Sequence, residues 1–320
     1  MFQVLIALAA LTTSAIAGPI LQPDPLDDES YAETYTAVAS LDDGSFVLMQ
    51  LLFTNAGFGD RRGACRALWV PPGQSGINGS ENADRDEWSY DSAKDTLTVG
   101  PCHLGASAGG LRFSAKLSEI SATLDIQSRA QSVQPPDHRI VVGGDFHESD
   151  IVVSRADVKA TVKAGGKTLV QNGAVHLDHS RSNTLLPKVA GCWMRFRGFS
   201  GAAPALLQVR IPPQGKVSKA WTWPLANPAP ATVDSSGVQF GKTSAGLPKL
   251  TVGGYAVEPT KTVYRYRPTE AYGALGKLAA PWIGDPTTTT YSATATDPAG
   301  AQIAGILEVS EIVENGCDVQ

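Results

Sequence analysis

The chain has 320 residues, with 26 Lys and Arg against 31 Asp and Glu and a formal net charge of −5. This balance, without a Lys/Arg-rich block, argues against nucleic acid or an anionic membrane surface as the main partner. The 32 glycines and 21 prolines, with few long helix-forming segments, predict an all-β protein.

The N-terminal residues 1–17, MFQVLIALAALTTSAIA, are an apolar run that ends in a small-x-small cleavage pattern. This pattern is typical of a secretory signal peptide, so we expect an exported protein, periplasmic or extracellular. The run is shorter than the ~20 residues that cross a bilayer, and we therefore expect no stable membrane anchor. Residues 18–31, which contain three prolines and an acidic cluster, are expected to form a flexible leader.

Short strands follow from residue 32 onward, separated by Gly, Pro and Asp turns. The expected strands are residues 32–39, 45–54, 64–70, 95–100, 111–117, 122–129, 151–161, 168–178, 205–211, 219–223, 237–240, 263–267, 291–296 and 303–313. Residues 45–54 are apolar nearly throughout, which indicates a strand covered on both faces. Residues 71–87 are expected to be a polar loop, and residues 269–278 are the one stretch that favours a helix.

The length of the mature chain exceeds what one hydrophobic core usually organises. We therefore expect two β-domains, residues 32–188 and 189–320. The clearest local feature is a hairpin, in which residues 151–161 and 168–178 flank a turn at Gly165 and Gly166.

The four cysteines are an even number in a chain expected to be exported, which favours disulfides. Of the three connectivities, Cys65 with Cys102 and Cys192 with Cys317 keeps each pair within one expected domain. No CxxC or CxxH spacing occurs, so a metal site is not expected.

The densest group of chemical side chains lies in residues 173–199. Within seven residues this stretch carries His176, Asp178, His179, Ser180, Arg181 and Ser182. On a strand, His176 and Asp178 share a face, and His179 faces away unless the strand ends there. The turn-forming composition Ser-Arg-Ser-Asn that follows favours such an end.

Trp193, Arg195 and Arg197 alternate with apolar residues, so a strand would present one indole and two guanidinium groups on one face. Buried arginines need carboxylate partners or a wet cavity, and Asp178 is a candidate partner for Arg195 or Arg197. The same alternation also fits a half-exposed edge face with solvated arginines. Both interpretations remain open from the sequence.

Residues 151–199 run in the order strand, glycine turn, G-x-x-x-x-D-H-S and W-x-R-F-R. This order resembles the lipocalin-like superfamily of carotenoid hydratases (hydroxyneurosporene synthases), AttH-like proteins and fungal decalin-forming Diels-Alderases. The resemblance implies two consecutive lipocalin-like antiparallel β-barrel or sandwich domains, with an apolar pocket at or near their junction. Leu177 stands where hydratase-like members tend to carry a histidine, so the resemblance supports the pocket more than carotenoid hydration.

Three kinds of chemistry fit the central stretch to different degrees. A Ser-His-Asp triad is disfavoured, because adjacent strand residues point to opposite faces and no GxSxG motif occurs. A metal site of His176, Asp178 and His179 lacks a clear further ligand. The remaining hypothesis is cofactor-free general acid-base catalysis by Asp178 and His179, in which an apolar pocket raises the pKa of the carboxyl group.

The expected ligand is a small apolar molecule of terpenoid or polyketide type, which the protein would hydrate, isomerise or cyclise. The expected ligand-binding residues are His176, Ser180, Arg181, Trp193, Arg195 and Arg197. A non-catalytic carrier is an alternative, because β-barrels enclose apolar ligands without needing chemistry. A purely structural role, with Asp178 and His179 tying the domains together, is a third.

Overall fold

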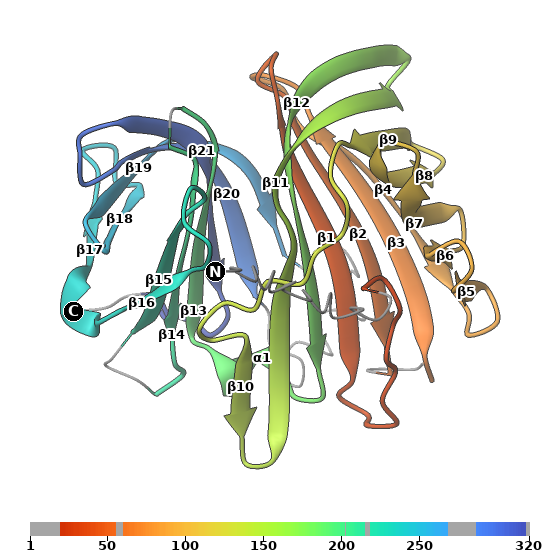
Figure 1. Cartoon of the computed structure of the whole chain (residues 1–320), viewed down its shortest axis with the longest axis horizontal. Helices are drawn as coiled ribbons and strands as arrows, with labels where there is room; N and C mark the ends of the chain where they lie inside the picture. The colour runs from red at the N-terminus through yellow and green to blue at the C-terminus, as the bar shows by residue number, and fades with distance from the viewer. Residues whose placement is uncertain (1–19, 56–59, 202, 215–217, 268–285, 318–320) are drawn as a thin grey trace, which may run out of the picture.

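The computed structural model describes residues 20–55, 60–201, 203–214, 218–267 and 286–317. These residues form two antiparallel sheets, one from each half of the chain, and each sheet curls into a nearly closed barrel (Figure 1). The predicted all-β class with two successive lipocalin-like domains is therefore confirmed. The expected signal peptide and the expected helix at residues 269–278 lie outside the described residues.

The N-terminal sheet is built from hairpins in the order β4-β3-β2-β1-β12-β11-β9-β8-β7-β6-β5, with β10 paired to β11. Its strands are β1 (Ala32–Leu41), β2 (Phe46–Thr54), β3 (Arg62–Val70), β4 (Ile77–Ala83), β5 (Trp88–Asp91), β6 (Thr96–Val99), β7 (Cys102–Ser107), β8 (Gly110–Lys116), β9 (Ile120–Ile126), β10 (Arg139–Val142), β11 (Asp145–Ala164) and β12 (Lys167–Ser182).

The C-terminal sheet has the order β16-β15-β14-β13-β21-β20-β19-β18-β17. Its strands are β13 (Cys192–Ser200), β14 (Ala205–Ile211), β15 (Lys219–Pro224), β16 (Ala231–Val233), β17 (Val238–Lys242), β18 (Pro248–Val252), β19 (Tyr255–Tyr266), β20 (Thr287–Thr296) and β21 (Gln302–Glu311). The short helix α1 (Leu186–Val189) lies between the two sheets in sequence, and the 3₁₀ turn η1 (Ser235–Gly237) precedes β17. The domain division expected at residues 188 and 189 falls in the linker between β12 and β13.

The predicted hairpin is formed by the long strands β11 and β12, which lie at the centre of the molecule (Figure 1). Its loop consists of Gly165 and Gly166, with φ angles of 55° and 72°. Positive φ at both central residues defines a type I′ turn, whose twist matches that of the paired strands.

Each barrel is filled by its own core, and the strands near the junction are also covered on their outer face. In β2, Val47, Met49 and Leu51 point into the N-terminal core, whereas Leu48 and Leu52 face the C-terminal domain. The apolar run at residues 45–54 therefore reflects two different environments, one on each face of the strand.

Two small apolar clusters join the domains. One combines Phe46, Leu68 and Val70 of the N-terminal domain with Phe199 and Ile306 of the C-terminal domain. The other packs Ile151 of β11 against residues of β14 and β15, namely Leu206, Trp221 and Trp223. Because burying a large apolar side chain stabilises by roughly 1.5–3 kcal/mol, these clusters hold the two outer faces together.

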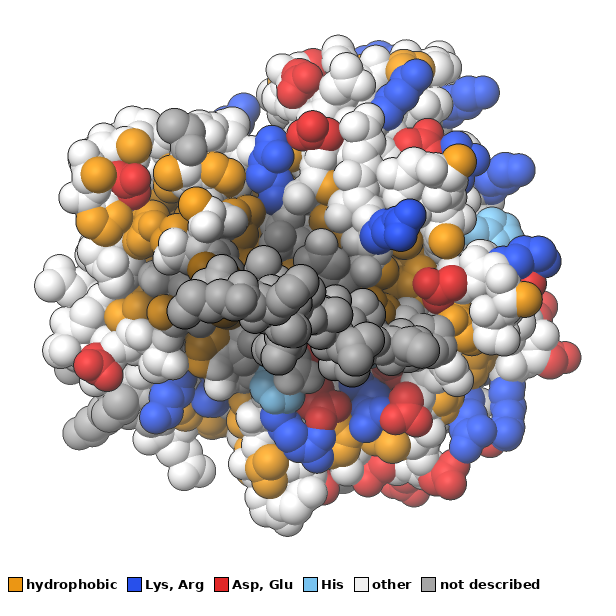
Figure 2. Space-filling model, in the orientation of Figure 1, with side chains coloured by type: hydrophobic (Ala, Val, Ile, Leu, Met, Phe, Trp, Pro, Cys, Tyr) orange, Lys and Arg blue, Asp and Glu red, His pale blue; other side chains and the backbone are white. Residues whose placement is uncertain are grey.

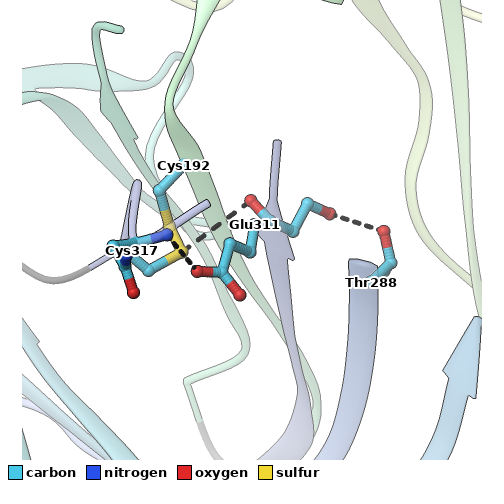
Figure 3. Close-up of a disulfide and its surroundings, with 6 residues drawn as sticks. Cys192, Thr288, Glu311 and Cys317 are labelled. Carbon is cyan, nitrogen blue, oxygen red and sulfur yellow. Dashed lines mark hydrogen bonds between the residues drawn. A yellow bond between two sulfur atoms is a disulfide. The ribbon is translucent and has the colours of Figure 1, made fainter. Parts of the chain in front are cut away.

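Both predicted disulfides are present, and no cysteine is free. Cys65 on β3 is joined to Cys102 on β7, with a Cα–Cα distance of 6.2 Å. Cys192, at the start of β13, is joined to Cys317 with a Cα–Cα distance of 4.9 Å. Figure 3 shows the second bond beside the end of β21, where the Ser310 hydroxyl lies 2.9 Å from that of Thr288.

Two local expectations were wrong. Residues 20–31 are not a free leader, because Leu21 and Tyr31 are fully buried and Leu26 packs on the N-terminal core. The expected loop at residues 71–87 contains β4, which among the described strands pairs with β3 alone. Its exposed Asn, Ser and Glu side chains hide the strand in the sequence, because an edge strand is recognised by its backbone pairing more than by apolar alternation.

The surface carries charged side chains of both signs, intermixed over the face seen in Figure 2. No helix in the described part of the chain is long and apolar enough to span a membrane.

Candidate functional site

A cavity of about 490 Å³ lies between the outer faces of the two sheets, a volume in the range of small-molecule sites. The N-terminal domain and the linker line it with Ala32, Thr34, Thr36, Leu48, Gln50, Leu52, Arg66, His147, Ser149, Asp178, Ser180, Ser182, Thr184 and Leu186. The C-terminal domain contributes Trp193, Arg195, Arg197, Tyr264, Tyr266, Pro286, Thr288, Thr290, Glu308, Ser310 and Ile312. The cavity thus lies at the domain junction, outside both barrel cores.

Strand register explains which N-terminal residues reach the cavity. Asp178 lies opposite Thr36, which lies opposite Gln50, which lies opposite Arg66. Residues directly opposite each other share one face of a sheet, about 4.8 Å apart from strand to strand. Four side chains from β12, β1, β2 and β3 therefore form one row across the cavity wall.

A second row crosses the facing sheet. Arg195 lies opposite Glu308, which lies opposite Thr290, which lies opposite Tyr264. On the other side Arg195 lies opposite Gln208 of β14, whose side-chain oxygen accepts a 2.8 Å hydrogen bond from Arg195 Nε. The two rows bring Asp178 together with Arg195 at one end, and Arg66 together with Tyr264 at the other.

Asp178 is the centre of this charged group. Its Oδ1 accepts a hydrogen bond from His176 Nε2 at 2.6 Å. Its Oδ2 accepts bonds from Arg195 Nη1 at 2.5 Å and from Arg197 Nη2 at 2.9 Å. Arg197, only 2% exposed, also pairs with Glu308. The predicted partnership of Asp178 with the arginines is confirmed, and it involves both of them.

The pKa of Asp178 is lowered, contrary to the raised value expected from an apolar pocket. Burial opposes ionisation, but Arg195, His176 and Arg197 together outweigh it and hold the pKa well below its usual range. Asp178 is therefore a permanent carboxylate, and both its oxygens are occupied by cations. It orients the arginines and does not serve as a proton donor near neutral pH.

His176 lies behind this carboxylate. Its Nδ1 is 3.0 Å from the backbone oxygen of Ser154, and its Nε2 contacts Asp178. The ring is therefore held between the backbone of β11 and the carboxylate of Asp178. His176 borders a separate space of about 10 Å³ behind Asp178 and Arg195, and not the main cavity.

His179 and Arg181 lie on the opposite face of β12 from Asp178. His179 Nε2 contacts Glu33 at 2.8 Å, and its ring stacks on Tyr35 with 4.4 Å between centroids. Arg181 pairs with Asp24 of the N-terminal segment. The turn expected after His179 does not occur, because β12 continues to Ser182 and keeps the two-residue period. His176, Asp178 and His179 therefore do not converge on one point, whereas Asp178, Ser180, Trp193, Arg195 and Arg197 do share the cavity wall.

His147 of β11 is a cavity residue that the sequence interpretation did not identify. It is 7% exposed, and its ring lies 5.1 Å from that of Trp193. Burial, with the positive charges of Arg195 and Arg210, lowers the pKa of His147 to about 4, so the ring is neutral at physiological pH. No local motif marks it, because its position depends on its pairing with Ser182 of β12.

Arg66, Tyr264 and Tyr266 form a second group on the wall, contributed by both domains. Arg66 Nη2 donates to the Tyr264 hydroxyl at 2.9 Å, and its guanidinium carbon lies 4.1 Å from the Tyr266 ring centroid. The alternation of the two tyrosines along β19 is visible in the sequence, but their contact with Arg66 is not. In the described part of the chain, no three His, Cys, Asp or Glu side chains group closely enough to hold a metal ion.

No family model matches the sequence, and no curated protein is similar to it in sequence. Solved structures do match its fold. A protein described as AttH from Nitrosomonas europaea has a TM-score of 0.62 at 10% identity, over 88% of this chain and 92% of that chain. CghA with Sch210972 has a TM-score of 0.58 at 11% identity over 90% of both chains.

Kievitone hydratase from Nectria haematococca has a TM-score of 0.57 at 10% identity over 92% of both chains. Identities of this size establish a shared fold. The resemblance is thus confirmed at the level of the fold: the chain shares its two-domain β-fold with these three proteins.

Proposed function

We propose that this protein is exported and binds a small, largely apolar molecule with an oxygen-bearing end in the cavity at the domain junction. The carrying observation is the cavity itself, in which aromatic and aliphatic residues share the wall with a preorganised pair of arginines. Leu48, Leu52 and Trp193 offer apolar contact, and Arg195 offers charge-assisted donation. Two disulfides support an oxidising, exported location.

In the catalytic version of this proposal, the protein also hydrates, isomerises or cyclises the bound molecule by proton transfer. Two structures with the same fold are described as a hydratase and as a protein solved with a small molecule. The arginines at the charged end would stabilise negative charge that develops on a substrate oxygen, as an oxyanion site does.

A non-catalytic carrier is the second candidate, and the state of Asp178 favours it. A carboxylate bound by three cations has no free oxygen to exchange protons with a substrate. His179, the other expected catalytic residue, lies across β12 from the cavity. A reaction would therefore depend on cavity groups other than these two.

The test is mass spectrometry of lipophilic molecules extracted from the purified protein. We expect a small molecule to co-purify with the wild type and to be lost from Leu52→Trp, which fills the cavity from β2. Val170→Trp, at a position 54% exposed and outside the cavity, is the matched control and should retain it. The proposed site would be contradicted if the molecule were recovered from Leu52→Trp. It would also be contradicted if no molecule were recovered from the wild type and the control. Incubating the protein with the extracted molecule then distinguishes the two candidate functions. An enzyme would release a chemically altered product, whereas a carrier would release the molecule unchanged.

A further inference from the structure

The cavity wall carries more positive than negative charge among its described residues. Its lining includes three arginines, Arg66, Arg195 and Arg197, but two carboxylates, Asp178 and Glu308. Asp178 is shared by Arg195, Arg197 and His176, and Glu308 is taken by Arg197. Arg195 donates through Nε to Gln208 and through Nη1 to Asp178. Its Nη2 makes no hydrogen bond with a described residue and is therefore available to donate to a ligand. A bound anion would balance the surplus charge.

His147 lines the same cavity and has unused hydrogen-bonding capacity. Its Nδ1 is buried and has no hydrogen-bond partner, which is uncommon for a buried polar atom. The charged groups that act on the ring are Arg195 on β13 and Arg210 on β14, and Ile140 lies opposite on β10. Burial disfavours a proton on the ring, and the two arginines add to this by repelling it.

An anion bound at Arg195 would reverse this balance. It would cancel the repulsion that the arginines exert, and the imidazolium form of His147 would gain a counter-ion in a site shielded from water. We propose that the cavity selects acids, such as carboxylic, enolic or phenolic molecules, and that His147 takes up a proton when the anion binds. This inference rests on the proposed function. For a ligand that arrives protonated, its O–H bond breaks, an N–H bond forms on His147, and the oxygen is held by Arg195.

Thermodynamic linkage predicts the direction in which the affinity for an anion changes with pH. A neutral His147 in the empty cavity and a charged one beside the anion mean that binding consumes a proton. Anion affinity is then greatest in acid and falls as the pH rises, by about tenfold per pH unit between about pH 4 and the pKa of the occupied state. An uncharged ligand of the same shape should show no such dependence.

Two fluorescent probes with the same ring skeleton test this directly: anilinonaphthalene sulfonate, which is anionic, and phenylnaphthylamine, which is uncharged. We expect both to bind wild type, with uptake of nearly one proton per sulfonate probe at about pH 5.5 and none for the uncharged probe. In His147→Gln the sulfonate probe should bind more weakly in acid than it does to wild type, with no proton uptake and no dependence of its affinity on pH over this range. His103→Gln, at an exposed histidine of β7 bonded to Thr98, is the matched control and should behave as wild type.

The outcomes separate this inference from the proposed function. Binding of the sulfonate probe without proton uptake, or uptake that persists in His147→Gln, would overturn the role of His147 and leave the cavity intact as a ligand site. Failure of both probes to bind would overturn both proposals. If His147→Gln does not fold, nitrogen NMR of the wild-type imidazoles decides, because saturation with the sulfonate probe should convert one buried neutral ring to an imidazolium.

Discussion

Asp178 is the residue on which the charged end of the cavity depends. Asp178→Asn would leave Arg197 buried with Glu308 as its remaining carboxylate, and Arg195 and His176 without one. Breaking a buried ion pair by removing one partner costs about 3–5 kcal/mol, so we expect a loss of that size in the free energy of unfolding. Thermal and urea denaturation measure it.

The control for Asp178→Asn is Asp125→Asn, whose partner Arg112 lies on an exposed part of the surface. Exposed pairs contribute about 0–1 kcal/mol, so this variant should unfold almost like wild type. A folded Asp178→Asn protein of wild-type stability would show that the ion network is dispensable for the fold. It would also reopen the catalytic interpretation of this carboxyl group.

His147 predicts how stability depends on pH. Its pKa is lowered to about 4 in the folded protein, whereas an unfolded histidine titrates near 6.5. The unfolded chain therefore binds more protons between these values, and stability is lost as the pH falls from about 6.5 to about 4. The difference corresponds to roughly 3 kcal/mol.

The measurement is urea unfolding at several pH values in this window. His147→Gln should flatten the pH dependence, because glutamine does not titrate. An unchanged slope in that variant would assign the acid lability to other groups.

At the scale of single elements, the β11–β12 hairpin predicts a purely conformational effect. Gly166 has φ 72° and no atom within 4 Å of the position of an added Cβ. Gly166→Ala should therefore destabilise by about 1–2 kcal/mol through backbone strain alone. Gly241→Ala in β17, where the space is equally open and φ is ordinary, should be neutral or slightly stabilising. Equal stabilities of the two variants, compared by urea denaturation, would contradict the type I′ assignment.

The elements that the sequence predicts are those with local causes. The paired glycines specify the hairpin turn, and β14 begins and ends at the predicted residues because its apolar run is bounded by Pro204 and Pro212. β4 was missed because an exposed edge strand lacks the apolar alternation that marks buried ones. Local pattern also gave the faces of Asp178 and Trp193, but it could not give the end of β12. One wrong turn there placed His179 in the cavity.

The position of His147 depends on contacts between distant segments. Its approach to Trp193 requires the register of the β11–β12 hairpin, the pairing of β13 with the distant strand β21, and the packing of one domain on the other. No spacing of residues along the chain encodes that geometry. The pKa of Asp178 was mispredicted for the same reason, because two of the three cations that lower it come from the other domain.

At the scale of the whole molecule, the two disulfides should contribute unequally. Cys192 and Cys317 are 125 residues apart in sequence, and Cys65 and Cys102 are 37 apart. In the chain-entropy model, closing these loops is worth about 5 and about 4 kcal/mol. Cys192→Ala with Cys317→Ala should therefore lower the urea midpoint more than Cys65→Ala with Cys102→Ala. If the variant without Cys65–Cys102 had the lower urea midpoint, the loss of a disulfide would act more through the native structure than through the entropy of the unfolded chain.

Because the cavity lies outside the barrels, the strands that form it divide their residues between two tasks. Along β2, the side chains of Val47, Met49 and Leu51 maintain the core, while Leu48 and Leu52 face the cavity. Mutation at a cavity-facing position outside the apolar clusters, such as Leu52, can therefore change the cavity wall while leaving the N-terminal core in place. The cavity-facing positions of β2 are therefore suitable places to randomise residues when ligands for the proposed site are selected in the laboratory.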